Sequence, residues 1–131
     1  MKTPNDLKYS DEHEWVRKLD DENVVMIGIT DFAQSELGDI VYVEVDTVGD
    51  ELEKDDVFGT VEAVKTTSDL YMPVSGTVLE FNSAIDENGD DEPELINESP
   101  YDKGWIIKIR MTDPAQYDDL MNAEEYTRLT S

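Results

Sequence analysis

Lys65 is the first residue of this sequence to consider for chemistry, because few other side chains could form a covalent bond. The sequence contains no cysteine, which excludes disulfides, thiolate metal sites and cysteine nucleophiles. Lys65 begins a short polar connection, residues 65–69, between two apolar segments, and this length is typical of a hairpin loop. An exposed hairpin tip is a favourable place for modification by another enzyme. Composition alone nevertheless favours an ordinary surface lysine.

His13 is the only histidine, so a metal site built on several imidazoles is excluded. A Ser-His-Asp triad would have one possible base. The neighbouring carboxylates of Glu12 and Glu14 could activate His13 as a base. Without a serine elbow or metal partners, a structural role for His13 is favoured.

Residues 86–94 form an acidic loop in which Asp86, Asn88 and Asp90 have the spacing of calcium ligands. The EF-hand template also requires Gly at position 91 and Glu at position 97, and the sequence has neither. We therefore expect a solvated loop and no metal site.

The charge of the chain limits its partners. With 10 Lys and Arg against 33 Asp and Glu, the formal charge is −23. Such a surface repels phosphates, so neither nucleic acid nor a membrane surface is an expected partner. Hydrophobic residues make up 38% of the chain, enough for a packed core. Since no apolar run reaches membrane-spanning length and no signal peptide is recognisable, we expect a soluble, cytoplasmic chain with one domain over residues 1–131.

The elements that must position these side chains are mainly strands. Short apolar or alternating runs predict strands at residues 24–29, 41–45, 57–64, 70–74, 76–81 and 105–111. Thr30 is a predicted N-cap for a short helix near residues 31–37, which Gly38 ends. Helical periodicity returns after residue 113, whereas the first dozen residues are predicted to be irregular. The fold class is therefore mainly β, with a short helix and a C-terminal helix.

Several motifs in this order resemble the glycine cleavage system H protein family, over almost the whole length. The lipoyl-lysine motif of that family is similar to residues 62–71 (EAVKTTSDLY) followed by residues 73–76 (PVSG). The other matching segments are YS at 9–10, HEWV at 13–16, IGITDFAQ at 27–34, LGDIVYVE at 37–44, PELIN at 93–97, PY at 100–101, GW at 104–105 and NAEEY at 122–126. Val64 before the lysine and Thr66 after it distinguish this motif from acyltransferase lipoyl domains and from biotin carriers.

The resemblance implies a flattened barrel-sandwich hybrid of two related sheets, the lipoyl-domain fold. It implies that lipoate is the cofactor, joined to Lys65 through an amide. Glu62 is implied as a recognition residue for lipoylation, and Gly49 and Gly76 as residues that present the hairpin. In this family the loaded arm folds into a cleft, and Glu14 and Asp69 are the residues expected to hold it there.

The implied function is that of a covalent carrier and not of an enzyme. A glycine decarboxylase (P protein) would load an aminomethyl group, a tetrahydrofolate-dependent aminomethyltransferase (T protein) would take it, and dihydrolipoyl dehydrogenase (L protein) would reoxidise the arm. A lipoate ligase or a lipoyl/octanoyl transferase would attach the cofactor. Two alternatives stay open: a lipoyl donor to 2-oxoacid dehydrogenases, and an H-like adaptor that is never lipoylated.

Overall fold

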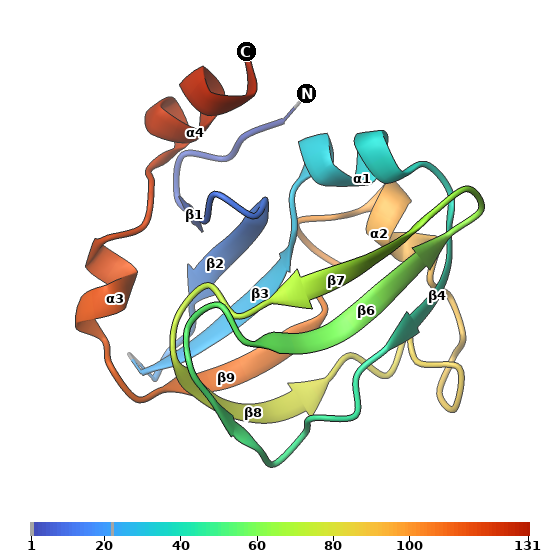
Figure 1. Cartoon of the computed structure of the whole chain (residues 1–131), viewed down its shortest axis with the longest axis horizontal. Coiled ribbons are helices and arrows are strands. Elements are labelled where there is room, and N and C mark those ends of the chain that lie inside the picture. The colour runs from blue at the N-terminus through green and yellow to red at the C-terminus, as the bar shows by residue number, and fades with distance from the viewer. Residues whose placement is uncertain (1, 22) are drawn as a thin grey trace.

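Antiparallel strands are the main regular structure of the molecule, and short helices lie around them (Figure 1). The computed structural model describes residues 2–21 and 23–131. The strands are β1 (Lys8–Tyr9), β2 (Glu14–Lys18), β3 (Val24–Ile29), β4 (Ile40–Glu44), β5 (Glu51–Leu52), β6 (Val57–Ala63), β7 (Thr67–Tyr71), β8 (Gly76–Phe81) and β9 (Ile107–Met111). The helices are α1 (Asp31–Leu37), α2 (Leu95–Glu98), α3 (Ala115–Asp118) and α4 (Ala123–Thr130).

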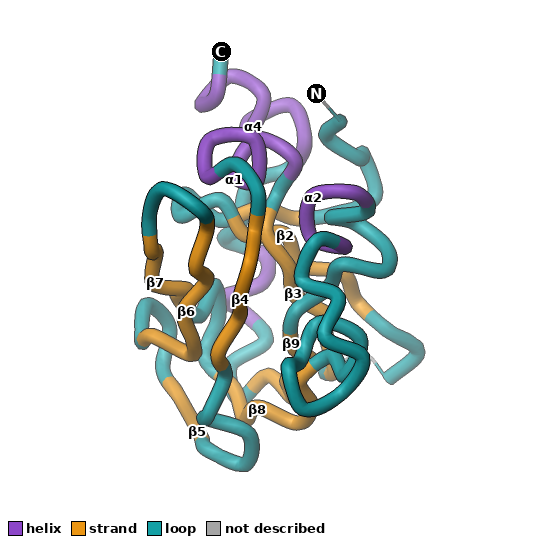
Figure 2. The backbone as a smooth tube through the Cα atoms, turned by 90° about the vertical axis from the view of Figure 1, so that its right-hand side faces the viewer, coloured by secondary structure: helices purple, strands orange, loops and turns teal. Residues whose placement is uncertain are grey.

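The strands are arranged in two sheets that face each other and do not close into a barrel. One sheet has six strands in the order β1-β2-β3-β9-β8-β5, and the other has three in the order β4-β6-β7. Every paired neighbour is antiparallel. The chain changes from one sheet to the other between β3 and β4, β4 and β5, β5 and β6, and β7 and β8, and Figure 2 shows the two layers from the side. This is the mainly β architecture that the sequence predicted.

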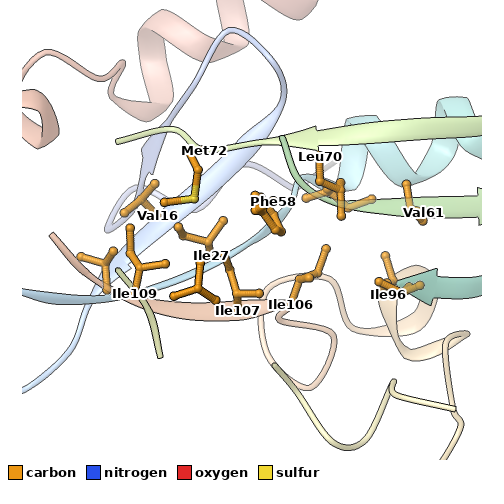
Figure 3. Packing of buried hydrophobic residues seen from close by; sticks show 14 of the residues in the cluster. Val16, Ile27, Phe58, Val61, Leu70, Met72, Ile96, Ile106, Ile107 and Ile109 are labelled. Carbon is orange, nitrogen blue, oxygen red and sulfur yellow. The ribbon is translucent and has the colours of Figure 1, made fainter. Parts of the chain in front are cut away.

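Alternating apolar residues on the inner faces fill the space between the sheets. In Figure 3, Val16, Ile27 and Ile109 of the six-stranded sheet belong to one continuous cluster with Phe58 and Leu70 of the three-stranded sheet. All five side chains are buried. Burial of this set fixes the register of both sheets, because a slip of one residue would turn each apolar side chain to the solvent.

A second, aromatic cluster lies outside the six-stranded sheet, where the N-terminal segment meets α4. We call it the aromatic corner; its buried members are Leu7, Tyr9, Trp15, Ala123 and Tyr126. The rings of Tyr9 and Tyr126 stack with centroids 4.7 Å apart. Backbone bonds in both directions between residues 9 and 121 hold the two chain ends together. The corner therefore joins segments that are more than a hundred residues apart in the sequence.

The predicted elements were confirmed at 24–29, 31–37 and 76–81. The differences around the hairpin have a physical reason. Thr30 caps α1 by accepting from the Ala33 N–H, as predicted. The predicted connection 65–69 was too long, because residues 67–69 pair with β6 despite their polar side chains. The strand predicted at 70–74 thus begins earlier, at residue 67, and it ends at residue 71.

The terminal regions also differ from the predicted pattern. The predicted C-terminal helix is two helices, α3 and α4, and Asn122 begins the second with a capping box. The first dozen residues include β1, whose pairing with β2 the polar composition did not indicate. Among the residues that the structure describes, no helix is both long and apolar enough to cross a membrane.

Candidate functional site

Lys65 lies in a two-residue turn at the tip of the β6–β7 hairpin. The Ala63 N–H donates to the Thr66 carbonyl oxygen at 2.7 Å and closes the turn around Val64 and Lys65. Lys65 is exposed, and the Val64 residue beside it is 69% exposed. Within the described part of the chain, no hydrogen bond or ion pair holds the Lys65 ammonium group. Its amine is therefore open to another protein.

The backbone below this tip is fixed. The hairpin is paired on its other side with β4, and the Val64 N–H donates to the Asp39 carbonyl oxygen at 3.1 Å. Val61, Ala63 and Leu70 anchor the two strands in the core. The arrangement combines a free side chain with a rigid base, which is the combination required to present one amine in a constant position.

The other residues predicted for the hairpin motif are distributed over two parts of the molecule. Glu62 is exposed on the hairpin, opposite Tyr42 of β4 and Thr67 of β7. Gly49 and Gly76 lie outside the hairpin: Gly49 is in the turn before β5, at the opposite end of the molecule from α1, and Gly76 begins β8 (Figures 1 and 2).

The local backbone explains why glycine is present at both positions. Gly49 has φ +95°, which a residue with a side chain adopts at a cost. A Cβ atom at Gly76 would lie 2.6 Å from the Arg110 carbonyl oxygen, so β8 and β9 could not approach as they do. These positions shape the β5–β8 end of the molecule, and their contribution to hairpin presentation stays a prediction.

A cleft of about 410 Å³ lies beside the hairpin and includes both predicted arm residues, Glu14 and Asp69. Residues 12–14 form one wall, one face of α1 forms a second, and residues 68–71 of β7 form a third. Apolar side chains of the lining, such as Phe32 and Leu37, alternate with carboxylates, including Glu36. The cleft thus combines apolar surface for an aliphatic chain with negative charge for a cation.

Glu14 is the most unusual group in this cleft, because it is a carboxyl group with a side chain that is nearly removed from water. The residue is 2% exposed. The Ser10 hydroxyl donates to Glu14 Oε1 at 2.6 Å, and the Tyr71 N–H donates to Oε2 at 3.3 Å. Burial raises the pKa of Glu14 to about 8, although both hydrogen bonds act in the opposite direction. Glu14 therefore holds a proton near neutral pH until a cation favours its charged form.

Two positions of this region had no predicted role. Ser10 is placed four residues before Glu14, and the motif YS contains it, but nothing in the sequence indicates that the two side chains meet. The Tyr126 hydroxyl is hydrogen-bonded to His13, at a sequence separation of 113. Only the folded chain brings these pairs together. His13 itself has the structural role favoured from the sequence, since its Nδ1 lies 2.8 Å from the Tyr126 hydroxyl.

The acidic loop uses its own carboxylates to hold its backbone. Asp86 Oδ1 accepts from the Asn88 N–H at 3.0 Å, and the Asp91 N–H donates to the Asp86 carbonyl oxygen. Over residues 2–21 and 23–131, no group of three or more acidic or histidine side chains is arranged to hold a metal ion. We assign no ligand to this loop.

Comparisons with known proteins agree with the lipoyl-lysine motif. Residues 7–131 match the family model described as glycine cleavage H-protein. The chain is 57% identical over 128 residues to the glycine cleavage system H protein of Halalkalibacterium halodurans, covering 98% of this chain and 95% of that protein. It is 52% identical over 129 residues to that of Prosthecochloris aestuarii, covering 98% of each.

A solved structure has the same fold. The crystal structure of a glycine cleavage system H protein from Mycobacterium marinum superposes with a TM-score of 0.83 at 34% identity. The alignment covers 95% of this chain and 96% of that one. The likeness thus extends over nearly the whole length of both chains.

Proposed function

This chain belongs to the glycine cleavage system H protein family, a lipoyl carrier of glycine cleavage, and from that membership we propose that Lys65 is the residue to which lipoate is joined. The observation that carries this proposal is the exposed Lys65 amine at the closed two-residue turn of a rigid hairpin. An acylating enzyme needs a free amine at a reproducible position, and both conditions are met here. Acylation removes the positive charge and leaves a neutral arm.

The residues around Lys65 fit such an arm. Ser68 and Asp69 line the cleft, so it begins three residues from Lys65, roughly 10 Å along an extended strand. A lysine side chain lengthened by the lipoyl acyl chain can reach this distance and lie along the apolar surface of Phe32 and Leu37. When bound, the lipoyl group supplies a disulfide that opens to thiols and carries the one-carbon unit of glycine cleavage. Residues 1–131 act as a single carrier domain in this proposal.

Glu62 and the two glycines have the supporting roles that the family motif gives them. The exposed Glu62 carboxylate is three residues before Lys65 on the same hairpin. A lipoate ligase or a lipoyl/octanoyl transferase would recognise it there. Gly49 and Gly76 keep the β5–β8 end in the shape from which the hairpin extends.

Glu14 and Asp69 hold the loaded arm. The free end of that arm bears an amine, which is a cation near neutral pH. Glu14 would lose its proton to solvent when this cation binds and would then form a buried charge pair, in which the Coulomb attraction is stronger than in water. Asp69 is exposed at the mouth of the cleft, where it attracts the cation but binds it less strongly.

The chemistry itself belongs to the partners in this proposal. The P protein loads the arm, the T protein unloads it and the L protein reoxidises it, so the chain is a substrate shared by three enzymes in the cytoplasm. Tethering raises the effective concentration of the carried group at each partner. The acidic surface around Glu36, Glu62 and Asp69 favours partners with basic docking surfaces.

The test of this proposal is the mass of the protein from its native cells, followed by lipoylation of the Lys65→Arg variant in vitro. Wild type should gain one lipoyl group on the peptide that contains Lys65, and the variant should gain none at an unchanged melting temperature, because arginine keeps the charge without an acylable amine. Lys103→Arg, at another exposed lysine, is the matched control and should be labelled like wild type. Labelling of Lys65→Arg, or unmodified protein in the native cells, would contradict the proposal.

A further inference from the structure

The hydroxyl group of Tyr126 is bonded to two walls of the cleft, although Tyr126 does not line the cleft itself. It lies 2.8 Å from His13 Nδ1 in the wall of residues 12–14. It also shares a hydrogen bond of 2.7 Å with the Thr30 hydroxyl at the start of α1. One atom of the C-terminal helix thus connects the two walls that stand opposite β7.

From this connection we propose that Tyr126 is a positioning residue for the cleft, which sets the distance between residues 12–14 and α1. The inference rests on the proposed role of the cleft as the place of the loaded arm. According to this inference, α4 contributes to the shape of the cleft, because the orientation of His13 and of the α1 N-terminus depends on a side chain from α4.

The wall of residues 12–14 needs such support. His13 has φ +68°, a left-handed conformation that is costly for a residue with a Cβ atom. The Thr30 N–H donates to the His13 carbonyl oxygen at 3.0 Å, and the His13 ring packs 5.0 Å from the ring of Phe32. These contacts and the Tyr126 hydroxyl hold a strained backbone that would otherwise relax, and the next residue in this wall is Glu14.

The second wall depends on the same atom. The Thr30 hydroxyl accepts from the Ala33 N–H at 3.1 Å and so caps α1, a helix of seven residues. The same hydroxyl also shares a hydrogen bond with the Tyr126 hydroxyl. Ala33 lines the cleft together with Phe32, so a change at Tyr126 reaches the cleft through the cap.

Tyr9 provides a matched control within the same stacked pair. Both tyrosines are buried, and their rings pack face to face. The Tyr9 hydroxyl donates to the Pro4 carbonyl oxygen at 2.6 Å, on the N-terminal segment, and Tyr9 does not line the cleft. Tyr9→Phe and Tyr126→Phe therefore each remove one buried hydroxyl from the aromatic corner, but only the second removes a bond to the cleft walls.

The experiment measures amide hydrogen exchange in the protein without lipoate, so it does not depend on Lys65. The two reporters are the Ala33 amide, which is bonded to the cap, and the Tyr71 amide, which is bonded to Glu14. Tyr126→Phe should speed exchange at both by about fivefold, the change expected for one net hydrogen bond. The ¹⁵N resonance of His13 Nδ1 should also shift. Tyr9→Phe should leave all three signals unchanged.

His13→Asn tests the link from its other end, and its own effect on the Tyr71 amide can be measured if Tyr126→Phe does not fold. Asparagine tolerates a positive φ better than most residues, so the backbone of the wall is kept. This variant should speed exchange at the Tyr71 amide, and adding Tyr126→Phe should have little further effect there, because the link is already broken. Additive effects of the two changes would overturn the proposal. Unchanged reporters in Tyr126→Phe, or equal changes in Tyr9→Phe, would also overturn it.

A final measurement connects the link to the carrier role. In lipoylated and loaded protein, Tyr126→Phe should lose the carried group several-fold faster than wild type and Tyr9→Phe. Faster exchange without faster loss would overturn the functional part of the inference while leaving Lys65 lipoylation intact. Absence of lipoylation in wild type would instead refute the proposed function, and the exchange measurement would still decide whether Tyr126 positions the cleft.

Discussion

The hairpin tip and the aromatic corner lie at two parts of the candidate site and differ in their exposure to solvent. At the tip, Val64 and Lys65 extend into solvent and the turn is closed by a single local bond. At the corner, Tyr9 and Tyr126 are buried, and their contacts join both ends of the chain. In the proposed carrier role, the tip has to be exposed so that partners can reach it, whereas the cleft wall beside the corner has to exclude water.

This difference explains where mutation should be tolerated. Substitutions at the tip remove almost no packing, so they change recognition and leave stability unaltered. Substitutions at the corner alter packing, a strained loop and the environment of Glu14 together. Stability and lipoylation are therefore expected to vary independently in the two regions, and the following predictions test that separation.

The largest expected effect is that of Tyr126→Ala. It removes an aromatic ring that is 1% exposed, together with the hydroxyl link, and should lower the free energy of unfolding by ~3–5 kcal/mol. Thr66→Ala at the tip should change it by no more than ~0.5 kcal/mol. Urea denaturation of both variants measures the contrast. Similar losses in the two variants would show that the tip contributes to stability as the corner does.

Glu14 should make the stability of the corner depend on pH. Its pKa is near 8 in the folded chain and near 4.5 in the unfolded chain, so between these values the folded state keeps a proton that the unfolded state has lost. The stability that this group contributes is therefore complete below about pH 4.5 and is lost as the pH rises through 8, by up to ~5 kcal/mol.

Glu14→Gln removes this titration. From pH 5 to pH 8.5, the free energy of unfolding of wild type should therefore fall relative to that of the variant. Glu62→Gln, at an exposed carboxylate of the hairpin, is the control variant. Parallel pH profiles of Glu14→Gln and wild type would contradict the protonated, buried state of Glu14.

Retention of the carried group should depend more on Glu14 than on Asp69. Loss of a partly buried charge pair costs ~1–3 kcal/mol, or roughly a five- to hundredfold faster release. Ammonia release from loaded carrier without aminomethyltransferase measures this rate. Glu14→Gln should be at the upper part of the range and Asp69→Asn at the lower part, with Glu94→Gln as an exposed control. Retention equal to wild type in both cleft variants would remove the protective role.

The smallest expected effect is that of salt. Repulsion within a chain of charge −23 is screened as the Debye length falls from ~30 Å at 0.01 M to ~3 Å at 1 M, so the melting temperature should rise modestly with sodium chloride. The pH-linked difference between wild type and Glu14→Gln should persist in salt, since it arises from burial. A melting temperature that stays flat or falls in 1 M salt argues against repulsion as a limit on stability.

The sequence predicted those features that depend on neighbouring residues. The N-cap at Thr30, the helix that Gly38 ends and the alternating strands were confirmed because short-range preferences decide them. The extent of β7 was not predicted. Thr67 and Ser68 have polar side chains, so the sequence shows no apolar pattern there. They belong to the strand because their backbone pairs with β6.

By itself, the sequence determined the family of the chain, the mainly β fold and the candidate lysine at a hairpin. Each of these follows from residue types within a short span, or from motifs in a fixed order. The tertiary structure alone decided that Glu14 is buried between Ser10 and Tyr71, and that Tyr126 bonds both His13 and Thr30. The physical reason is that the burial and the pKa of a side chain depend on which segments exclude water from it. Those segments are distant in the sequence and meet only when the chain packs.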